Sequence, residues 1–154
     1  SASQKELQAQ LDLLLAIRDR TSEARRAGRR IVGITKQVQE WGSRAAGREG
    51  ASALSDAASD LLAKLGSLKV ELIAALEPWE EPQWRPAGVG EMLEALFPVV
   101  SSTDARPTTQ SSEVFEELSA RLDSRLAALQ ELIDGDVARF ANLVRSAGIP
   151  LVEA

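Results

Sequence analysis

Apolar residues recur along most of the chain at intervals of three and four, the spacing that places side chains on one face of an α-helix. No stretch has the strict alternation that is typical of a half-buried strand. The pattern predicts four helices, over residues 4–45, 51–77, 89–102 and 107–147. Short connections between successive helices favour antiparallel neighbours. The sequence therefore predicts a single all-α domain, an antiparallel up-down four-helix bundle with long first and fourth helices and a short third helix.

The first predicted helix ends in the glycine-rich stretch AGREG. From Ala24 onward its inward face follows an alternating three- and four-residue spacing, as in a bundle helix. A break at Thr21–Ser22 is the alternative interpretation and would divide the segment in two. The residues that carry the pattern are Ile17, Ala24, Ala27, Ile31, Ile34, Val38, Trp41 and Ala45.

Prolines mark the limits of the next two predicted helices. The second helix carries a leucine-rich stripe and is expected to stop at Pro78, because proline cannot continue a helix. The stretch EPWEEPQWRPAG follows as a loop. The third helix is short, and Pro98 within it allows a kink or an early end.

The fourth predicted helix keeps its apolar spacing through the sequence DGD at 134–136, although a break at Gly135 is the alternative. Its start lies within 107–112, in the stretch SSTDARPTTQSSEVFEEL. Pro107 suits the first turn of a helix, where its missing N–H is not needed. Gly148 stands where a helix-ending glycine is expected, with Pro150 just beyond it.

The predicted helices differ in length, and this difference suggests an exposed region. At 1.5 Å per residue the first and fourth helices are each about 60 Å long, and the third is about 20 Å long. A four-helix core can then exist over only part of this height. We expect the N-terminal turns of the first helix and the C-terminal half of the fourth to project as a pair.

The leucines at 11–15 spread over more of the helix circumference than one neighbour can cover. Two interpretations are open. In the first, the loop with Trp79 and Trp84 covers this end of the bundle. In the second, the leucines form a partner-binding surface, because large exposed apolar areas usually mark interfaces. The candidate interface residues are Leu7, Leu11, Leu14, Leu15, Phe140 and Val144.

Composition narrows the possible functions. The chain has 154 residues, enough to bury a core, and its first residues include neither Met nor a leader-like segment, so we expect a processed or excised part of a larger protein. It contains no Cys and no His, which excludes zinc sites with such ligands, thiolate nucleophiles and imidazole acid–base chemistry. A net charge of −5 argues against nucleic-acid binding. The chain contains no apolar run of about 18 residues, so the sequence predicts no membrane span.

The remaining candidate chemistry is weak, and we expect no cofactor, no metal and no catalytic residue. Cations on one face of the first helix are interpreted as a solvated outer face, with a polyanion site as the alternative. The carboxylates of the fourth helix flank its apolar stripe and are interpreted as surface groups. Trp79 and Trp84 could form a ligand or glycan platform. The cations are Arg18, Arg25, Arg29 and Lys36, with Arg26 and Arg30 nearby, and the acids are Glu113, Glu116, Glu117, Asp134 and Asp136.

Two stretches of the chain carry a family resemblance. These are LLAIRDRTSEARRAGRRIVGITKQVQEW near the start and LEALFPVVSSTDARPTTQSSEVFEELSARLD in the second half. They resemble the helical C-terminal region of bacterial sortilin-like or BNR-repeat β-propeller proteins, which are often labelled glycosyl hydrolases. The resemblance implies an accessory helical domain next to a propeller, outside the cytoplasm. It transfers no catalytic residue, because enzymatic chemistry would belong to the propeller.

Taken together, these observations predict a non-enzymatic accessory domain that mediates protein–protein contact. The partner would be a second copy, as in a homodimer, or the parent propeller domain. The alternative is a small-ligand or glycan-binding module that uses the tryptophan-containing loop. A weaker third hypothesis is an enzyme that uses only carboxylates, as some glycosidases do.

Overall fold

The computed structural model describes residues 3–77, 79–80, 86–102 and 107–150 of the chain. Over these ranges it contains helices and no strand, so the predicted all-α bundle is confirmed. None of the described helices is long and apolar enough to cross a membrane. The elements are α1 (Gln4–Ala45), α2 (Ser52–Leu72), α3 (Val89–Ser101), α4 (Thr109–Leu132), the π-helical turn η1 (Ile133–Val137) and α5 (Ala138–Ser146).

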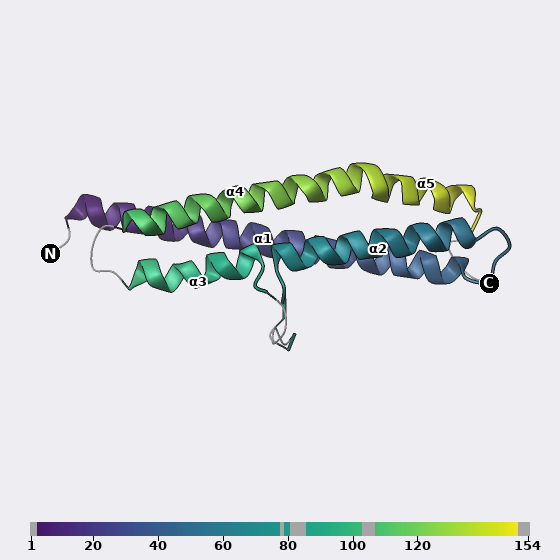
Figure 1. The fold of residues 1–154 in the computed structure, drawn as a ribbon, viewed down its shortest axis with the longest axis horizontal. Helices are drawn as coiled ribbons and strands as arrows, with labels where there is room; N and C mark the ends of the chain where they lie inside the picture. Colours follow the sequence, from purple (N-terminus) through teal and green to yellow (C-terminus); the bar gives the residue numbers. More distant parts are fainter. Residues whose placement is uncertain (1–2, 78, 81–85, 103–106, 151–154) are drawn as a thin grey trace.

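The helices form an elongated rod (Figure 1). Helix α1 runs the length of the rod, and α2 returns beside its C-terminal half. Helix α3 then continues in the same direction as α2, beside the N-terminal half of α1. Helix α4, followed by η1 and α5, runs back along the whole rod. Helices α1 and α2 are therefore antiparallel neighbours, and so are α3 and α4. Helices α2 and α3 lie end to end, so the rod is three helices thick.

This arrangement corrects the expectation of a projecting pair. Helices α1 and α4 run parallel, and the first turns of α1 alone extend past the start of α4 and the end of α3 (Figure 1). The C-terminal half of the fourth predicted helix lies at the opposite end of the rod. The physical reason is that α2 and α3 together cover most of the length of α1, which leaves no long helix without a neighbour.

Helix α1 is continuous, and the alternative of a break at Thr21–Ser22 is wrong. Its start is capped reciprocally, because Ser3 Oγ accepts from the Glu6 N–H at 3.2 Å and Glu6 Oε2 accepts from the Ser3 N–H at 2.9 Å. The Thr21 hydroxyl donates to the Ile17 carbonyl at 2.8 Å, so the hydroxyl is satisfied within the helix.

The core follows the predicted stripes along most of the rod. Apolar side chains of α1, α2, α3 and α4 interdigitate in one continuous cluster, and a smaller cluster joins α1 to the end of α3. The largest fully buried side chains are Ile17, Ile31, Leu65, Leu72, Ile73, Leu93, Val100 and Leu122.

Helix α2 ends at Leu72, so the predicted extent to residue 77 is too long. The Glu91 carboxylate of α3 takes the backbone groups that a longer helix would have used. It accepts hydrogen bonds of 2.9 Å from the N–H groups of Ala74, Ala75 and Gly88. One side chain therefore ends α2 and caps the start of α3. Pro78, where the sequence predicted the stop, lies outside the described residues.

Glycines allow the elements at this junction to approach closely. A Cβ atom on Gly88 would lie 2.8 Å from both the Ile73 nitrogen and the Val70 oxygen, which are backbone atoms. A Cβ atom on Gly28 of α1 would lie 2.6 Å from Ile73 Cγ2. Both contacts are shorter than real Cβ atoms make, so the packing of α1 and α3 against the end of α2 requires glycine.

The fourth predicted helix is continuous through Gly135, where it widens into the π-helical turn η1. It begins at Thr109, inside the predicted window, and the Thr108 hydroxyl caps it by accepting from the Ser111 N–H at 3.0 Å. Pro107 precedes this cap rather than lying in the first turn. The helix ends at Ser146, and Gly148 adopts a φ of 64°, as predicted for a helix-ending glycine.

Replacement of Glu91 tests the junction. We expect Glu91→Ala to lower the free energy of unfolding by about 3 kcal/mol, because three largely buried N–H groups lose a charged acceptor. Urea unfolding followed by circular dichroism at 222 nm measures this loss. The matched control is Glu113→Ala on the exposed side of α4, with an expected change below about 0.5 kcal/mol. Equal stabilities for the two variants would contradict the role of Glu91.

Candidate functional site

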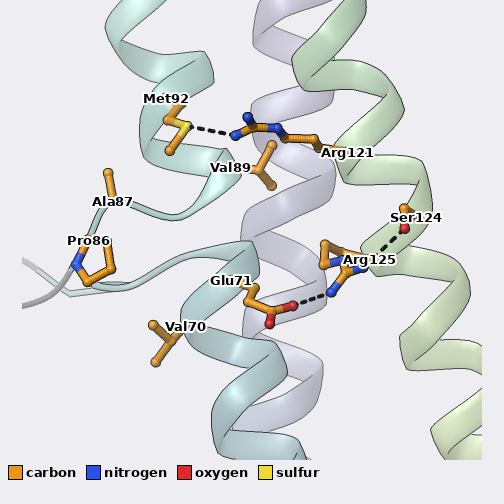
Figure 2. A pocket seen from close by; sticks show the side chains of 9 residues that line it. All are labelled: Val70, Glu71, Pro86, Ala87, Val89, Met92, Arg121, Ser124 and Arg125. Carbon is orange, nitrogen blue, oxygen red and sulfur yellow. Dashed lines mark hydrogen bonds and ion pairs between the residues drawn. The ribbon is translucent and has the colours of Figure 1, made fainter.

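A cavity of about 410 Å³ lies where the α2–α3 junction faces α4 (Figure 2). Valine, proline and methionine side chains supply apolar walls from α2, α3 and the segment before α3, and α4 contributes two arginines. Its volume is within the range of small-molecule sites in proteins. The lining residues are Val70, Glu71, Pro86, Ala87, Val89, Met92, Arg121, Ser124 and Arg125.

The polar groups of this cavity already have partners. Arg125 forms an ion pair with Glu71 across the α2–α4 interface and donates to Ser124 Oγ at 3.2 Å (Figure 2). Arg121 lies 3.7 Å from the Met92 sulfur and pairs with Glu117 at 3.2 Å. The Glu71 carboxylate, which lies in the lining, pairs with Arg125, and Ser124 accepts from the same guanidinium, so the serine is not activated as a nucleophile. The arrangement suits packing and ion pairing between helices.

A second apolar groove, also about 410 Å³, lies between the C-terminal half of α1 and α5. Phe140 is 5% exposed and belongs to the core, while Val144 is half-buried in the groove wall. Trp41, which the sequence assigns to the core, is partly buried and packs against the core. The Arg44 guanidinium lies 4.8 Å from the centre of the Trp41 ring. Phe140 and Val144 therefore contribute to packing at this end of the rod.

The four candidate interface leucines lie at the other end. Leu7, Leu11 and Leu15 are 50%, 48% and 39% exposed along one face of α1. Leu14 is half-buried against the small cluster that α1 makes with α3. The structure therefore brings the leucines together and separates them from Phe140 and Val144, because the start of α1 and helix α5 lie at opposite ends of the rod (Figure 1).

Of the two loop tryptophans, Trp79 lies within the described residues. Trp79 is 76% exposed and belongs to the segment between α2 and α3, and this junction lies in the middle of the rod, away from the start of α1 (Figure 1). Trp84 lies outside the described residues. Glu80, next to Trp79, accepts from the Leu76 N–H at 2.9 Å, and this hydrogen bond is the main reason that the pKa of Glu80 is lowered.

Charged residues divide into paired and unpaired groups. On α1, Arg25 binds Glu94 of α3, and Arg18 pairs with Asp19 at 3.2 Å. The remaining cations of the predicted basic face, Arg29 and Lys36, are exposed and make no ion pair within the described part of the chain. The same is true of Arg26 and Arg30.

The four acids Glu113, Glu116, Glu117 and Asp134 are exposed as predicted. Across the described ranges, no group of three or more acidic side chains is arranged to hold a metal ion.

Asp136 differs from the other acids because it joins two elements. Its carboxylate accepts from Lys64 of α2 at 2.6 Å and pairs with Arg139 one turn later. The hydrogen bond from Lys64 is the main cause of a lowered pKa at Asp136, and burial opposes it. Sequence periodicity could not identify this contact, because the π-helical turn sets the direction of the side chain.

The lowered pKa of Asp136 predicts that the contribution of this residue to stability depends on pH. An acid with a lower pKa in the folded than in the unfolded state stabilises the fold above its ordinary value of 3.8 and loses this effect as the pH falls through the folded value. We expect Asp136→Asn to be less stable than the wild type at pH 7 by at most about 1 kcal/mol. The difference should disappear in acid. Urea unfolding between pH 7 and pH 2.5 measures it, with Asp56→Asn as the control. A constant difference across this range would contradict the ion-pair explanation.

In comparisons with known proteins, no family model, curated protein or solved structure matches the chain.

Proposed function

We propose that the chain is a non-enzymatic helical-bundle domain that mediates contact with another protein. One observation carries the proposal. Large apolar side chains are exposed mainly at the end of the rod where α1 and α4 begin and α3 ends. Six of the eight such side chains among the described residues lie there: Leu7, Leu11, Leu15, Phe97, Val99 and Val114.

The geometry of the leucines supports a contact surface. Leu7, Leu11 and Leu15 are four residues apart, so they form a stripe about 12 Å long on one face of α1. An amphipathic groove or helix on a partner could bury such a stripe, with a gain of about 25 cal/mol for each Å² of apolar surface removed from water. Polar groups that could drive bond-breaking chemistry are not needed for this role.

The partner is a second copy of the chain or an adjacent domain of a longer protein. The resemblance to helical regions that follow β-propellers favours the second option, in which the leucines dock onto the propeller. The same resemblance suggests a location outside the cytoplasm. The contact would be independent of salt, because it is apolar.

The double variant L11K/L15K tests this function. We expect the wild type to dimerise, or as a monomer to bind a hydrophobic dye, and the variant to do neither, because lysine removes the apolar stripe. Light scattering on a size-exclusion column and dye fluorescence measure both properties. Leu143→Lys, at a residue of similar exposure at the other end of the rod, is the matched control. A wild-type monomer that binds no dye would refute the proposal.

A second candidate function rests on Trp79, whose exposed indole at 76% is available to stack on a ligand. A small-ligand or glycan-binding loop would change tryptophan fluorescence on titration with a sugar or lipid panel. Trp79→Phe should abolish the change, whereas Trp41→Phe should preserve it. Unchanged fluorescence with every ligand would remove this candidate.

A further inference from the structure

Four cations on the outer face of α1 have no ionic partner within the described ranges. We call Arg26, Arg29, Arg30 and Lys36 the basic cluster. All four side chains are exposed and make neither an ion pair nor a hydrogen bond there. Several cations on other faces are paired: Arg20 binds Asp123 at 2.5 Å and Lys64 binds Asp136 at 2.6 Å. The cluster is thus a local excess of positive charge on a chain with a net charge of −5.

Gly33 lies at the centre of the basic cluster. Arg29 and Arg30 precede it by four and three residues, and Lys36 follows it by three, so all three side chains surround it on the helix surface. A Cβ atom on Gly33 would meet nothing within 4 Å, and Gly33 lies within α1 without a positive φ. Neither packing nor backbone conformation within the chain requires glycine here, although glycine weakens a helix. A bare backbone lets another helix approach closely.

Helix α4 has a surface of opposite charge and similar shape. Glu113, Glu116 and Glu131 are exposed and make no ion pair or hydrogen bond within the described ranges. The exposed residues Ala120 and Ala127 lie between them, seven residues apart and therefore on the same side of the helix. We call these five residues the acidic face. Its small side chains also permit close approach of a helix.

The two surfaces cannot meet within one molecule. Helix α1 contacts α4 through Arg20, whose guanidinium donates to the Ser119 carbonyl at 2.9 Å. At 3.6 residues per turn, Gly33 lies about 140° around α1 from Arg20, so the basic cluster is turned away from α4. The acidic face that could complement it must belong to another molecule.

We propose that the basic cluster of one copy packs against the acidic face of a second copy. Gly33 then faces the alanines of the partner, and the cations pair with its three glutamates. Because the two surfaces differ, the contact is heterologous and leads to a ring or an open chain of molecules rather than a closed pair. The pairs remain close to solvent, so the association weakens as salt is raised. This contact is separate from the apolar one formed by the leucines.

A charge-swap experiment tests the contact in the L11K/L15K background, in which the leucines make no contribution. We expect association at low salt, measured by sedimentation velocity, that is lost at high salt. R29E/R30E and E116K/E131K should each weaken it by on the order of tenfold or more, because like charges then face each other. An equimolar mixture of the two variants should restore association. Gly33→Leu should weaken it without lowering helix content.

Two charge reversals outside both surfaces, Arg145→Glu and Asp56→Lys, serve as controls and should associate like the background protein. Circular dichroism verifies that each variant folds. The absence of low-salt association, or association unaffected by the reversals, would overturn the proposal. It would also be overturned if the cluster instead bound phosphatidylserine vesicles or duplex DNA without self-association. Loss of the leucine contact alone does not change the low-salt association through the basic cluster. The two proposals can therefore fail independently.

Discussion

The Glu91 carboxylate is the interaction on which the arrangement of the helices depends. It accepts three backbone N–H groups, two from the segment after α2 and one from the start of α3. Without it the three amides would lose their acceptor at the junction of the two helices. With it the chain leaves α2 at Leu72, and α3 begins against the same spot. Gly88 and Gly28 allow the close packing that brings the carboxylate within reach.

The end-to-end placement of α2 and α3 explains the uniform thickness of the rod. Each half of α1 has a returning helix beside it, and α4 with α5 completes the third side (Figure 1). Ion pairs between neighbouring helices occur along this length, with Arg25–Glu94 joining α1 to α3 and Arg125–Glu71 joining α4 to α2. These pairs are partly exposed, so they favour this register by a modest amount while the apolar core provides most of the stability.

The surface that remains is divided by chemistry. Apolar side chains gather at the end where α1 begins, and unpaired cations occupy the middle of the outer face of α1. The cavity at the junction has its charges satisfied internally. The features available to a partner are therefore on the outside of the rod, which is why both proposals concern contacts with proteins and differ in their response to salt.

The sequence alone determined the all-α class, the limits of α1 and the helix-ending role of Gly148, because helix periodicity and capping depend on residues a few positions apart. It also identified the exposed leucines and the basic residues as separate groups. Only the tertiary structure decided that α2 stops at Leu72, that α3 continues along it, and that Phe140 lies far from Leu11. Those outcomes depend on contacts between distant residues, such as Glu91 with Ala74 and Lys64 with Asp136. No local pattern records the direction in which a connection turns, because the energy that selects it comes from packing across helices.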